Sequence, residues 1–440
     1  MHQDNAQEGG SSDQWLPEQS LLADRSFWGL AITQFLGAFN DNLYKQLMLL
    51  MAVGGAGAMI KDDRQGWATF AFSLPFVLLS GLAGYLSDRN SKSRIIVICK
   101  VAEIAITLLA VLAFLMYGNL GDYGTWTVLV LMGIHSTFFG PAKYGILPEL
   151  FHHKHLPRAN GLILMSTFLA IILGVVLAGA IKEAVVTLDA QGQEDYSRLW
   201  IGSLACAVVA VVGTLTSLLV RYTMPVQPQA KFQFADSIVP ASIVSLLSKD
   251  RPLLMALIVS SVFWLVGGLV MPVVNRMGKE QLQQADTKTS VLTAGLAIGI
   301  IIGAVTANVV LKRLAKDKQV MLGVLIMILS MCMVSLWRPN GDVFLGYNGT
   351  FLGLIVAGIG AAVFVIPIQV FLQERPPLEL KGRLIGTMNF ANFVGILLAG
   401  PIYQVLIQVA QGMNWPVSSV FAMMAAMLLP ILLFYRLPKL

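Results

Sequence analysis

The chain has few charged residues. Only 12% of its 440 residues are Asp, Glu, Lys or Arg, whereas 56% are hydrophobic and the mean hydropathy is +0.72. A soluble domain usually carries about 25% charged residues. This sequence has too little polar surface to cover itself in water, so its composition excludes an ordinary soluble domain and indicates a membrane protein.

Cysteine is also scarce. The three cysteines, Cys99, Cys206 and Cys332, lie within apolar runs and have no metal-binding spacing, which is typical of small core residues. The histidine-rich stretch FHHKH at 151–155 is not a metalloprotease motif, because no glutamate lies between its histidines. We therefore expect no enzymatic activity and no cofactor other than a coupling ion, H⁺ or Na⁺.

Basic residues exceed acidic ones, giving a net charge of +6 and a pI of about 9.2. They recur in short groups between apolar segments rather than on one amphipathic face. This pattern indicates membrane orientation rather than a nucleic-acid partner, and we expect none. The polar first 26 residues lack the regions of a signal peptide, so 1–26 is expected to be a cytoplasmic tail.

Apolar segments long enough to cross a bilayer occur twelve times. They fall at 27–55, 67–86, 95–117, 125–147, 162–181, 199–220, 253–274, 291–311, 320–337, 351–372, 384–409 and 417–437. The polar stretch 221–251 divides them into two sets of six. We expect an all-α membrane protein with two pseudo-symmetric six-helix bundles, 27–220 and 252–440, joined by a cytoplasmic linker.

Lys and Arg are unevenly distributed among the connecting segments. The side that contains the linker and the 84–94 loop holds many more of them than the opposite side. Because the side richer in Lys and Arg faces the cytoplasm, both termini are expected to be cytoplasmic.

The two halves share short sequence matches at a constant offset. Glu149 and Arg158 in the first half recur as Glu374 and Arg383 in the second, 225 positions later. Such matches suggest a duplicated six-helix unit. A duplicated unit predicts a substrate site between the halves near the middle of the membrane, with alternating access by rocking.

The loop GYLSDRNSKSR at 84–94 resembles the signature loop of the major facilitator superfamily. Its glycine lets helices approach closely, its acid can face a helix N-terminus, and its arginines can pair with acids of the other half. With the two acid–base pairs, this loop is expected to hold the cytoplasmic side closed, although solvated surface charges and a purely topogenic loop are the alternatives. The predicted gate comprises Gly84, Asp88, Arg89, Arg94, Glu149, Arg158, Glu374 and Arg383.

Polar residues inside the spans mark a candidate cavity for substrate and coupling ion. Gln34, Asp41 and Lys45 share one helical face, and Asp41 and Lys45 are one turn apart, so they are expected to pair. The alternative is an internal ion pair that only fixes helix packing. The predicted cavity set is Gln34, Asn40, Asp41, Asn42, Lys45, Glu103, His135, Lys143, Gln369, Asn389 and Asn392.

Glu103 and His135 each have two interpretations. Burial favours a protonated carboxyl and histidine changes charge near neutral pH, so both suit a role in ion coupling. Alternatively, Glu103 pairs with a nearby base and His135, beside Ser136, is a structural hydrogen-bonding residue. Because the second-half candidates are neutral, a site with one charged wall and one apolar wall favours an amphiphilic substrate over a sugar.

Four short stretches together resemble the bacterial lysophospholipid transporter family of the major facilitator superfamily. They are FGPAKYGILPEL at 139–150, FNDN at 39–42, RANG at 158–161 and LQER at 372–375. The resemblance implies a secondary-active, alternating-access transporter in the bacterial inner membrane. It implies movement of lysophospholipids toward the cytoplasmic leaflet for re-acylation by a separate acyltransferase, with roles for Asp41 and Lys143. The Lys143 ammonium would hold a lipid phosphate or a carboxylate, or would reach toward the headgroups.

One feature departs from that family. After SSVFW the family tends to carry an arginine within the seventh span, whereas here the first base is Arg276 at its outer end. The exact substrate therefore stays open, beyond the membrane lipids that any such protein contacts. The alternative function is a proton-coupled efflux antiporter of small amphiphilic solutes or drugs, with Asp41 or Glu103 titrating.

Overall fold

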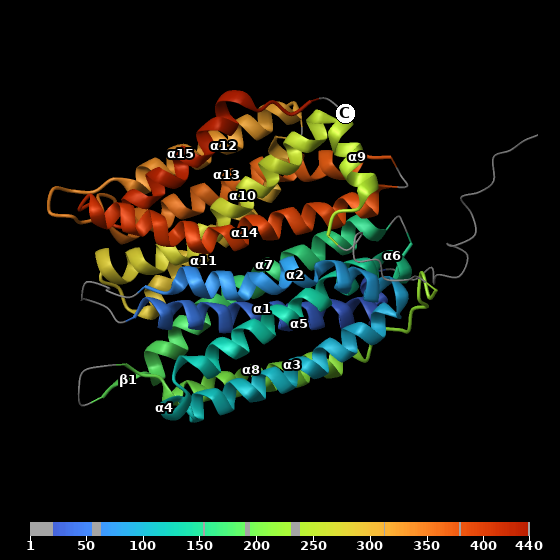
Figure 1. The fold of residues 1–440 in the computed structure, drawn as a ribbon, viewed down its shortest axis with the longest axis horizontal. Coiled ribbons are helices and arrows are strands. Elements are labelled where there is room, and N and C mark those ends of the chain that lie inside the picture. The colour runs from blue at the N-terminus through green and yellow to red at the C-terminus, as the bar shows by residue number, and fades with distance from the viewer. Residues whose placement is uncertain are drawn as a thin grey trace, which may run out of the picture.

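The computed structural model describes residues 21–54, 63–152, 155–189, 194–229, 238–311, 313–377 and 380–438. Long helices dominate these residues and run side by side along one direction (Figure 1). The first half contains α1 (Arg25–Val53), α2 (Gln65–Arg89), α3 (Lys92–Leu115), α4 (Tyr117–Leu120), α5 (Asp122–Gly145), α6 (Leu147–Leu150), α7 (Leu156–Val185) and α8 (Trp200–Ser217). The strands β1 (Thr187–Leu188) and β2 (Glu194–Asp195) pair antiparallel after α7.

The second half contains a further set of long helices. They are α10 (Arg251–Arg276), α11 (Asp286–Val305), α12 (Lys316–Ser335), α13 (Gly346–Glu374), α14 (Lys381–Gly412) and α15 (Ser419–Phe434). Short π-helical segments, Met277–Gln281 and Thr306–Val310, extend α10 and α11. Helix α9 (Ala241–Lys249), with Ile243 and Leu247 buried, lies in the segment expected to be a polar linker and was not predicted.

The predicted fold class is confirmed. Each of the twelve predicted spans corresponds to one long helix. The largest differences are at α7, which begins at Leu156 where 162 was predicted, and at α11, whose α-helical part ends at Val305 where 311 was predicted. Within the described residues, nine helices are long and apolar enough to cross a membrane by length and composition, and α15 is a shorter apolar helix. Helices α1 and α5, which carry the polar residues considered below, fall outside those nine.

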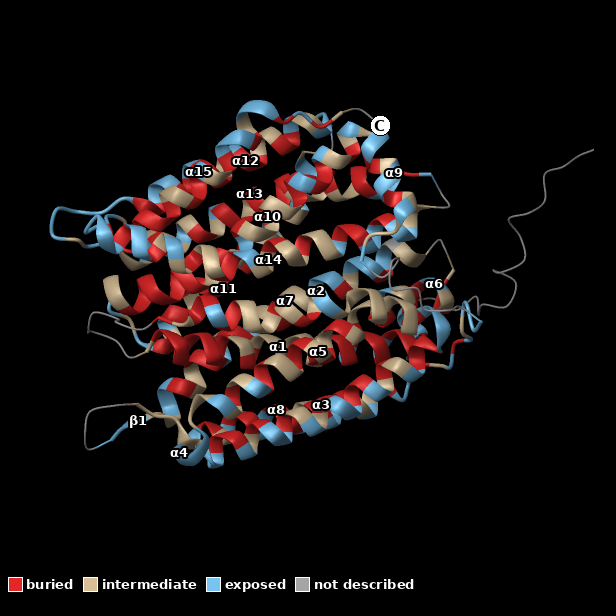
Figure 2. Cartoon of the chain, in the orientation of Figure 1, coloured by how far each residue is buried: buried red, intermediate tan, exposed pale blue. Residues whose placement is uncertain are grey.

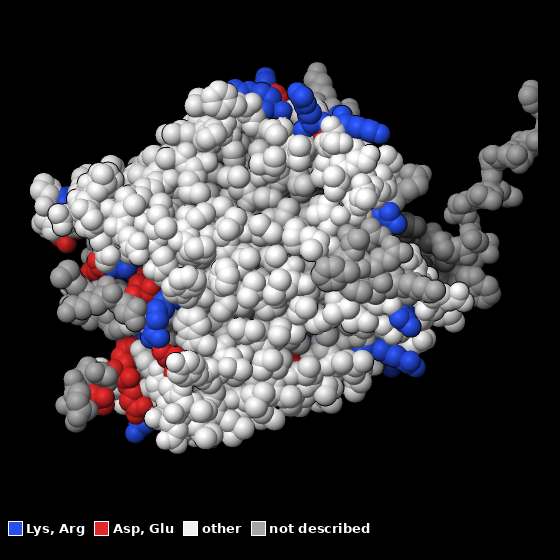
Figure 3. Space-filling view, in the orientation of Figure 1, with Lys and Arg blue, Asp and Glu red and all other residues white. Residues whose placement is uncertain are grey.

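The outer surface supports this assignment. Large apolar side chains such as Ile98, Leu215 and Leu218 are exposed on the outside of the bundle, and exposed residues line the outer faces of its helices (Figure 2). In the view of Figure 3 a broad belt is free of Lys, Arg, Asp and Glu, and charged residues gather toward the edges. An apolar belt between charged ends is the surface that a bilayer requires.

The bundle has two distinct ends. We call the end with α6, α9 and the C-terminus the linker end, and the end with α4 and the β1–β2 hairpin the hairpin end (right and left in Figure 1). The halves meet along two helix pairs, α2 with α14 and α7 with α11.

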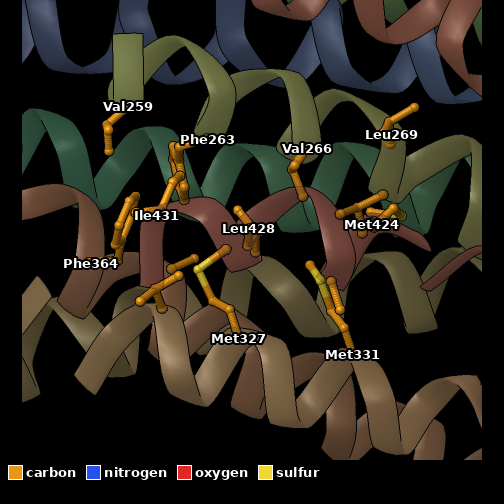
Figure 4. Close-up of a cluster of buried hydrophobic side chains, with 14 of the residues drawn as sticks. Val259, Phe263, Val266, Leu269, Met327, Met331, Phe364, Met424, Leu428 and Ile431 are labelled. Carbon is orange, nitrogen blue, oxygen red and sulfur yellow. The ribbon is translucent and has the colours of Figure 1, made fainter. Parts of the chain in front are cut away.

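The second half has one continuous apolar core. Side chains from α10, α12, α13 and α15 interlock in its centre (Figure 4). The core includes Val259, Phe263, Val266, Leu269, Met327, Met331, Phe364, Met424, Leu428 and Ile431, all less than 9% exposed. Such packing makes this half a rigid body, since close-packed interiors deform little.

Small residues bring helices of the second half into backbone contact. A Cβ at Gly299 of α11 would collide with the Ile355 carbonyl of α13, and a Cβ at Gly358 with the Leu296 carbonyl. Helices in lipid associate through such small-residue contacts, because lipid provides no hydrophobic driving force between them.

Gly299→Leu is therefore expected to destabilise the purified protein by about 1–3 kcal/mol, the usual cost of overpacking. Gly382→Leu is a matched control on α14, because a Cβ there would meet no described atom within 4 Å. Thermal unfolding in detergent measures both. Equal melting temperatures for the two variants would contradict the assigned contact.

Candidate functional site

Three buried amides join the halves at the hairpin end. Gln46 of α1 donates from Nε2 to Asn275 Oδ1 on α10 at 2.8 Å, and Asn275 Nδ2 donates to Gln65 Oε1 on α2 at 3.0 Å. All three side chains are fully buried. Because buried amides are costly unless paired, this chain of bonds favours the position in which the halves meet here.

A charged contact reinforces the amides. Arg276 Nη1 lies 3.3 Å from Asp63 Oδ2, Tyr403 of α14 donates to the same carboxylate oxygen, and Gln65 Nε2 donates to the Tyr403 hydroxyl at 3.3 Å. Burial raises the pKa of Asp63, while the bonds from Tyr403 and Gln65 and the charge of Arg276 oppose the shift. Two of the groups that stabilise this carboxylate, Arg276 and Tyr403, belong to the other half. We call the residues of both contacts the seal: Gln46, Asp63, Gln65, Asn275, Arg276 and Tyr403.

A second charged contact joins α7 to α11. The buried Lys182 ammonium lies 2.9 Å from Glu194 Oε2 and 3.3 Å from Asp286 Oδ2, and Lys279 lies 2.6 Å from Asp286 Oδ1. A Cβ at Gly179 would collide with the Asp286 carbonyl. The hairpin end is therefore closed along both helix pairs that join the halves.

At the linker end the halves diverge. Helices α2 and α14 touch through the backbones of Gly66 and Gly400, and the stacked rings of Phe76 and Phe393 have centroids 4.0 Å apart. Farther along the same helices, a Cβ at Gly84 or at Gly386 would meet no described atom within 4 Å. Among the described residues the halves are therefore in contact at the hairpin end, and they lie apart around Gly84 and Gly386 at the linker end.

The predicted gate contacts are not formed among the described residues in this conformation, so the gate stays a prediction. Glu149 pairs with Lys92 instead of Arg158, which is exposed. Arg89 donates to Tyr85 on its own helix, and Arg383 of α14 donates to Ser242 of α9 at 3.1 Å. These side chains pair within their own half because the two halves lie apart at this end.

The remaining gate residues also lie apart from the opposite half. Arg94 packs over the Tyr222 ring at 5.1 Å, while Asp88 and Glu374 are exposed. The arginine of the LQER stretch, Arg375, instead lies 2.7 Å from Asp250 Oδ2, and its hydrogen bond lowers the pKa of Asp250. This contact ties the segment before α10 to the end of α13.

The polar face of α1 lies beside α2, α5 and α7. Asp41 Oδ2 accepts a 2.5 Å hydrogen bond from Ser136 of α5, whereas the Lys45 ammonium lies over the Phe72 ring of α2 at 5.1 Å. The predicted pairing of Asp41 with Lys45 is therefore wrong in this conformation, since each side chain contacts a neighbouring helix. Gln34, on the same face, donates to Thr167 of α7 at 3.1 Å.

Two predicted cavity residues lie inside the first half instead. Asn40 Nδ2 donates to Glu103 Oε1 at 2.7 Å, and Glu103 Oε2 pairs with Lys100. Asn40, Lys100 and Glu103 are at most 1% exposed, so in this conformation they do not line an open space. Asn42 donates to the Ala38 carbonyl of its own helix at 2.8 Å.

His135 and Lys143 lie on α5, one on each side of Phe139. The buried His135 ring stacks on Phe139 with centroids 6.1 Å apart, and the half-buried Lys143 ammonium lies 5.6 Å from the same ring and 4.9 Å from that of Tyr144. Because its contacts among the described residues are with aromatic faces, the Lys143 ammonium can still bind an anion.

The second half contributes neutral groups. Asn392 accepts from Ser260 of α10 at 2.9 Å and is buried, Gln369 is half-buried and Asn389 is exposed. The roles predicted for these three residues stay predictions. The seal residues were not predicted. Two features of the sequence could have indicated them: the amide of Gln46 within the apolar first span, and Arg276 directly after the apolar seventh span.

Two helical bundles joined by a polar seal at one end are an architecture typical of membrane transporters. The sequence model of the major facilitator superfamily matches residues 30–400. The chain therefore belongs to this superfamily, whose members are transporters rather than enzymes.

Curated relatives confirm the resemblance carried by the motifs. The chain is 26% identical over 402 residues to the lysophospholipid transporter LplT of Serratia proteamaculans (strain 568), covering 90% of this chain and 92% of the relative. It is 27% identical to the lysophospholipid transporter LplT of Yersinia pestis (strain Pestoides F), covering 89% and 90%.

Solved structures share the fold at low identity. A POT family transporter in complex with a thioalcohol-conjugated peptide aligns with a TM-score of 0.69 at 14% identity, covering 96% of this chain and 99% of that one. FucP in the outward conformation aligns with a TM-score of 0.63 at 14% identity, covering 93% and 97%. These likenesses establish the architecture alone.

Asp63→Ala is expected to open the hairpin end, because removing one partner of a buried ion pair costs about 3–5 kcal/mol. The measurement is maleimide labelling of Ser290→Cys, a position buried in α11 beside Gln46, with the three native cysteines replaced by alanine. Labelling should rise at least about tenfold, since 1.4 kcal/mol corresponds to a factor of about ten.

Asp195→Asn is the matched control at the same end, because Asp195 Oδ1 and Oδ2 accept hydrogen bonds from Ser197 within the first half. Its labelling rate should equal that of the parent. An Asp63→Ala protein that labels as slowly as this control would rule out the seal.

Proposed function

We propose that this protein is a secondary-active transporter that moves lysophospholipids by alternating access. The observation that carries the proposal is a polar face on α1, with Asp41 and Lys45 half-buried, inside an otherwise apolar helical bundle that opens at one end. The similarity to lysophospholipid transporters over about 90% of the chain supports this substrate class.

The linker end is proposed to face the cytoplasm of the bacterial inner membrane. It carries the 84–94 loop and the segment between the halves, which are rich in Lys and Arg, and such segments stay on the cytoplasmic side. With this orientation the conformation is open inward. It suits release toward the cytoplasmic leaflet, where a separate acyltransferase would use the product.

The charges of the first half suit a zwitterionic headgroup. Asp41 supplies a carboxylate for a headgroup ammonium, and Lys143 supplies an ammonium for the phosphate, since its contacts are aromatic faces. The predicted cavity residues of the second half are neutral, which leaves apolar surface for the single acyl chain. A sugar would instead require polar groups from both halves.

Asp41→Asn is expected to abolish lysophosphatidylethanolamine uptake into proteoliposomes, because the amide cannot balance the headgroup charge. Uptake of a fluorescent lysolipid, with and without proton and sodium gradients, is the measurement. The variant should remain folded and membrane-inserted, as shown by an unchanged melting temperature.

Asp342→Asn makes the same chemical change at an exposed loop position and should transport normally. Uptake by Asp41→Asn at the rate of this control would refute the role of Asp41. No uptake by the parent protein in any gradient would refute the substrate class itself.

A second candidate function is a proton-coupled efflux antiporter of small amphiphiles. The observation that favours it is the buried group of Lys100, Glu103 and His135 in the first half. Proton-driven efflux of a lipophilic cation by a preparation that ignores lysolipids would support the antiporter and exclude the lysophospholipid transporter.

A further inference from the structure

A cluster of ionisable side chains lies inside the first half, where α1, α3 and α5 meet. Glu103 of α3 accepts from Asn40, pairs with Lys100 and lies 3.6 Å from His135 Nε2. All of these side chains are at least 95% buried. If the cluster only held the helices together, the Lys100–Glu103 ion pair would be sufficient. Such a role does not explain why the His135 imidazole is buried beside this pair.

The hydrogen-bonding capacity of His135 is unused. Both ring nitrogens are buried without a hydrogen-bond partner among the described residues, and so is Asp41 Oδ1. Ser136, the next residue after His135, donates to the other oxygen of Asp41. Buried polar atoms without partners are rare in native structures, and here two imidazole nitrogens and one carboxylate oxygen lack a hydrogen-bond partner within one small region.

The charged groups around the cluster have different kinds of contact. Lys100 and Glu103 neutralise each other in direct contact, whereas the ammonium groups of Lys45 and Lys143 lie over aromatic rings. From α8 the cluster receives the Cys206 carbonyl, bonded by Asn40, and Thr214, bonded to the Lys100 carbonyl. Helix α2 carries no charged residue between Gln65 and Asp88.

Asp41 is half-buried: its Oδ2 accepts a hydrogen bond from Ser136, whereas its Oδ1 is enclosed without a hydrogen-bond partner among the described residues. A charge on an oxygen enclosed in this way is costly. Two events can relieve it: a cationic group of the substrate can bind Asp41, or the imidazole beside it can take up a proton. A protonated imidazole has two N–H donors, and Nε2 already lies 3.6 Å from Glu103 Oε2.

We infer that His135 is a proton-binding site of the transport cycle and that its proton competes with a cationic headgroup for the charge of Asp41. His135 takes up one proton when the headgroup dissociates, and it releases this proton when the next headgroup binds. Each lysolipid is therefore exchanged for one proton. The inference rests on the proposed function for the identity of the competing cation.

The first test is the pH profile of uptake without a gradient. Uptake of lysophosphatidylethanolamine by the parent should fall as pH decreases from about 8 to 5, by up to about tenfold per unit once the imidazole is mostly protonated. In His135→Gln the profile should be flat. Uptake of lysophosphatidylglycerol, which has no headgroup cation, should not fall with acidification in either protein.

His155→Gln, at a described position near the linker end, is the matched control and should keep the parent profile. A parent profile in His135→Gln would overturn the inference.

A second readout separates this inference from the proposed function. The ¹⁵N signals of labelled histidine in the purified protein, with His135 identified by the signal lost in His135→Gln, report the gain of a second N–H directly. If the parent takes up no lysolipid but His135 titrates between about pH 5 and 9, the substrate class fails and the proton site stands. A His135 signal that is constant over this range would overturn the proton site, whatever the uptake result.

Discussion

The contact of Asp63 with Arg276 and Tyr403 at the hairpin end is the interaction on which the observed conformation depends. It joins α10 and α14 of the second half to the segment before α2 of the first. A buried ion pair is a poor source of net stability compared with apolar packing, because desolvation offsets most of the attraction. It is well suited to a contact that must form in one position of the halves and be replaced by water in another.

The two halves differ in the kind of interior that they present. The second half is packed with aliphatic and thioether side chains, and its helices contact each other through glycine. The first half buries a lysine, a glutamate, a histidine and an asparagine between α1, α3 and α5. The close-packed second half is the rigid element. The polar interior of the first half provides groups whose charge can change during the proposed transport cycle.

Hydropathy and length were sufficient to predict the twelve long helices, because a bilayer imposes both on any helix that crosses it. They could not predict which polar groups would pair. Asp41 and Lys45 have the spacing of an intrahelical pair, yet each contacts a different helix, and Glu149 contacts Lys92 across two helices. These choices depend on helix rotation and on the conformation, neither of which leaves a periodic signal. Helix α9 was missed because a nine-residue amphipathic segment in a polar stretch has too few positions to show a pattern.

The absence of a base in the middle of α10 has a mechanical consequence. Arg276, the basic residue at the far end of that helix, is part of the seal, and the cavity residues predicted in the second half, Gln369, Asn389 and Asn392, are neutral. If Asp41 and Lys143 bind the headgroup as proposed, the counter-charges of a charged ligand lie on α1 and α5 of the first half. The ligand would then stay bound to the first half while the second half rotates relative to it. The second half would contribute a changing apolar surface to the site rather than a second set of charged contacts.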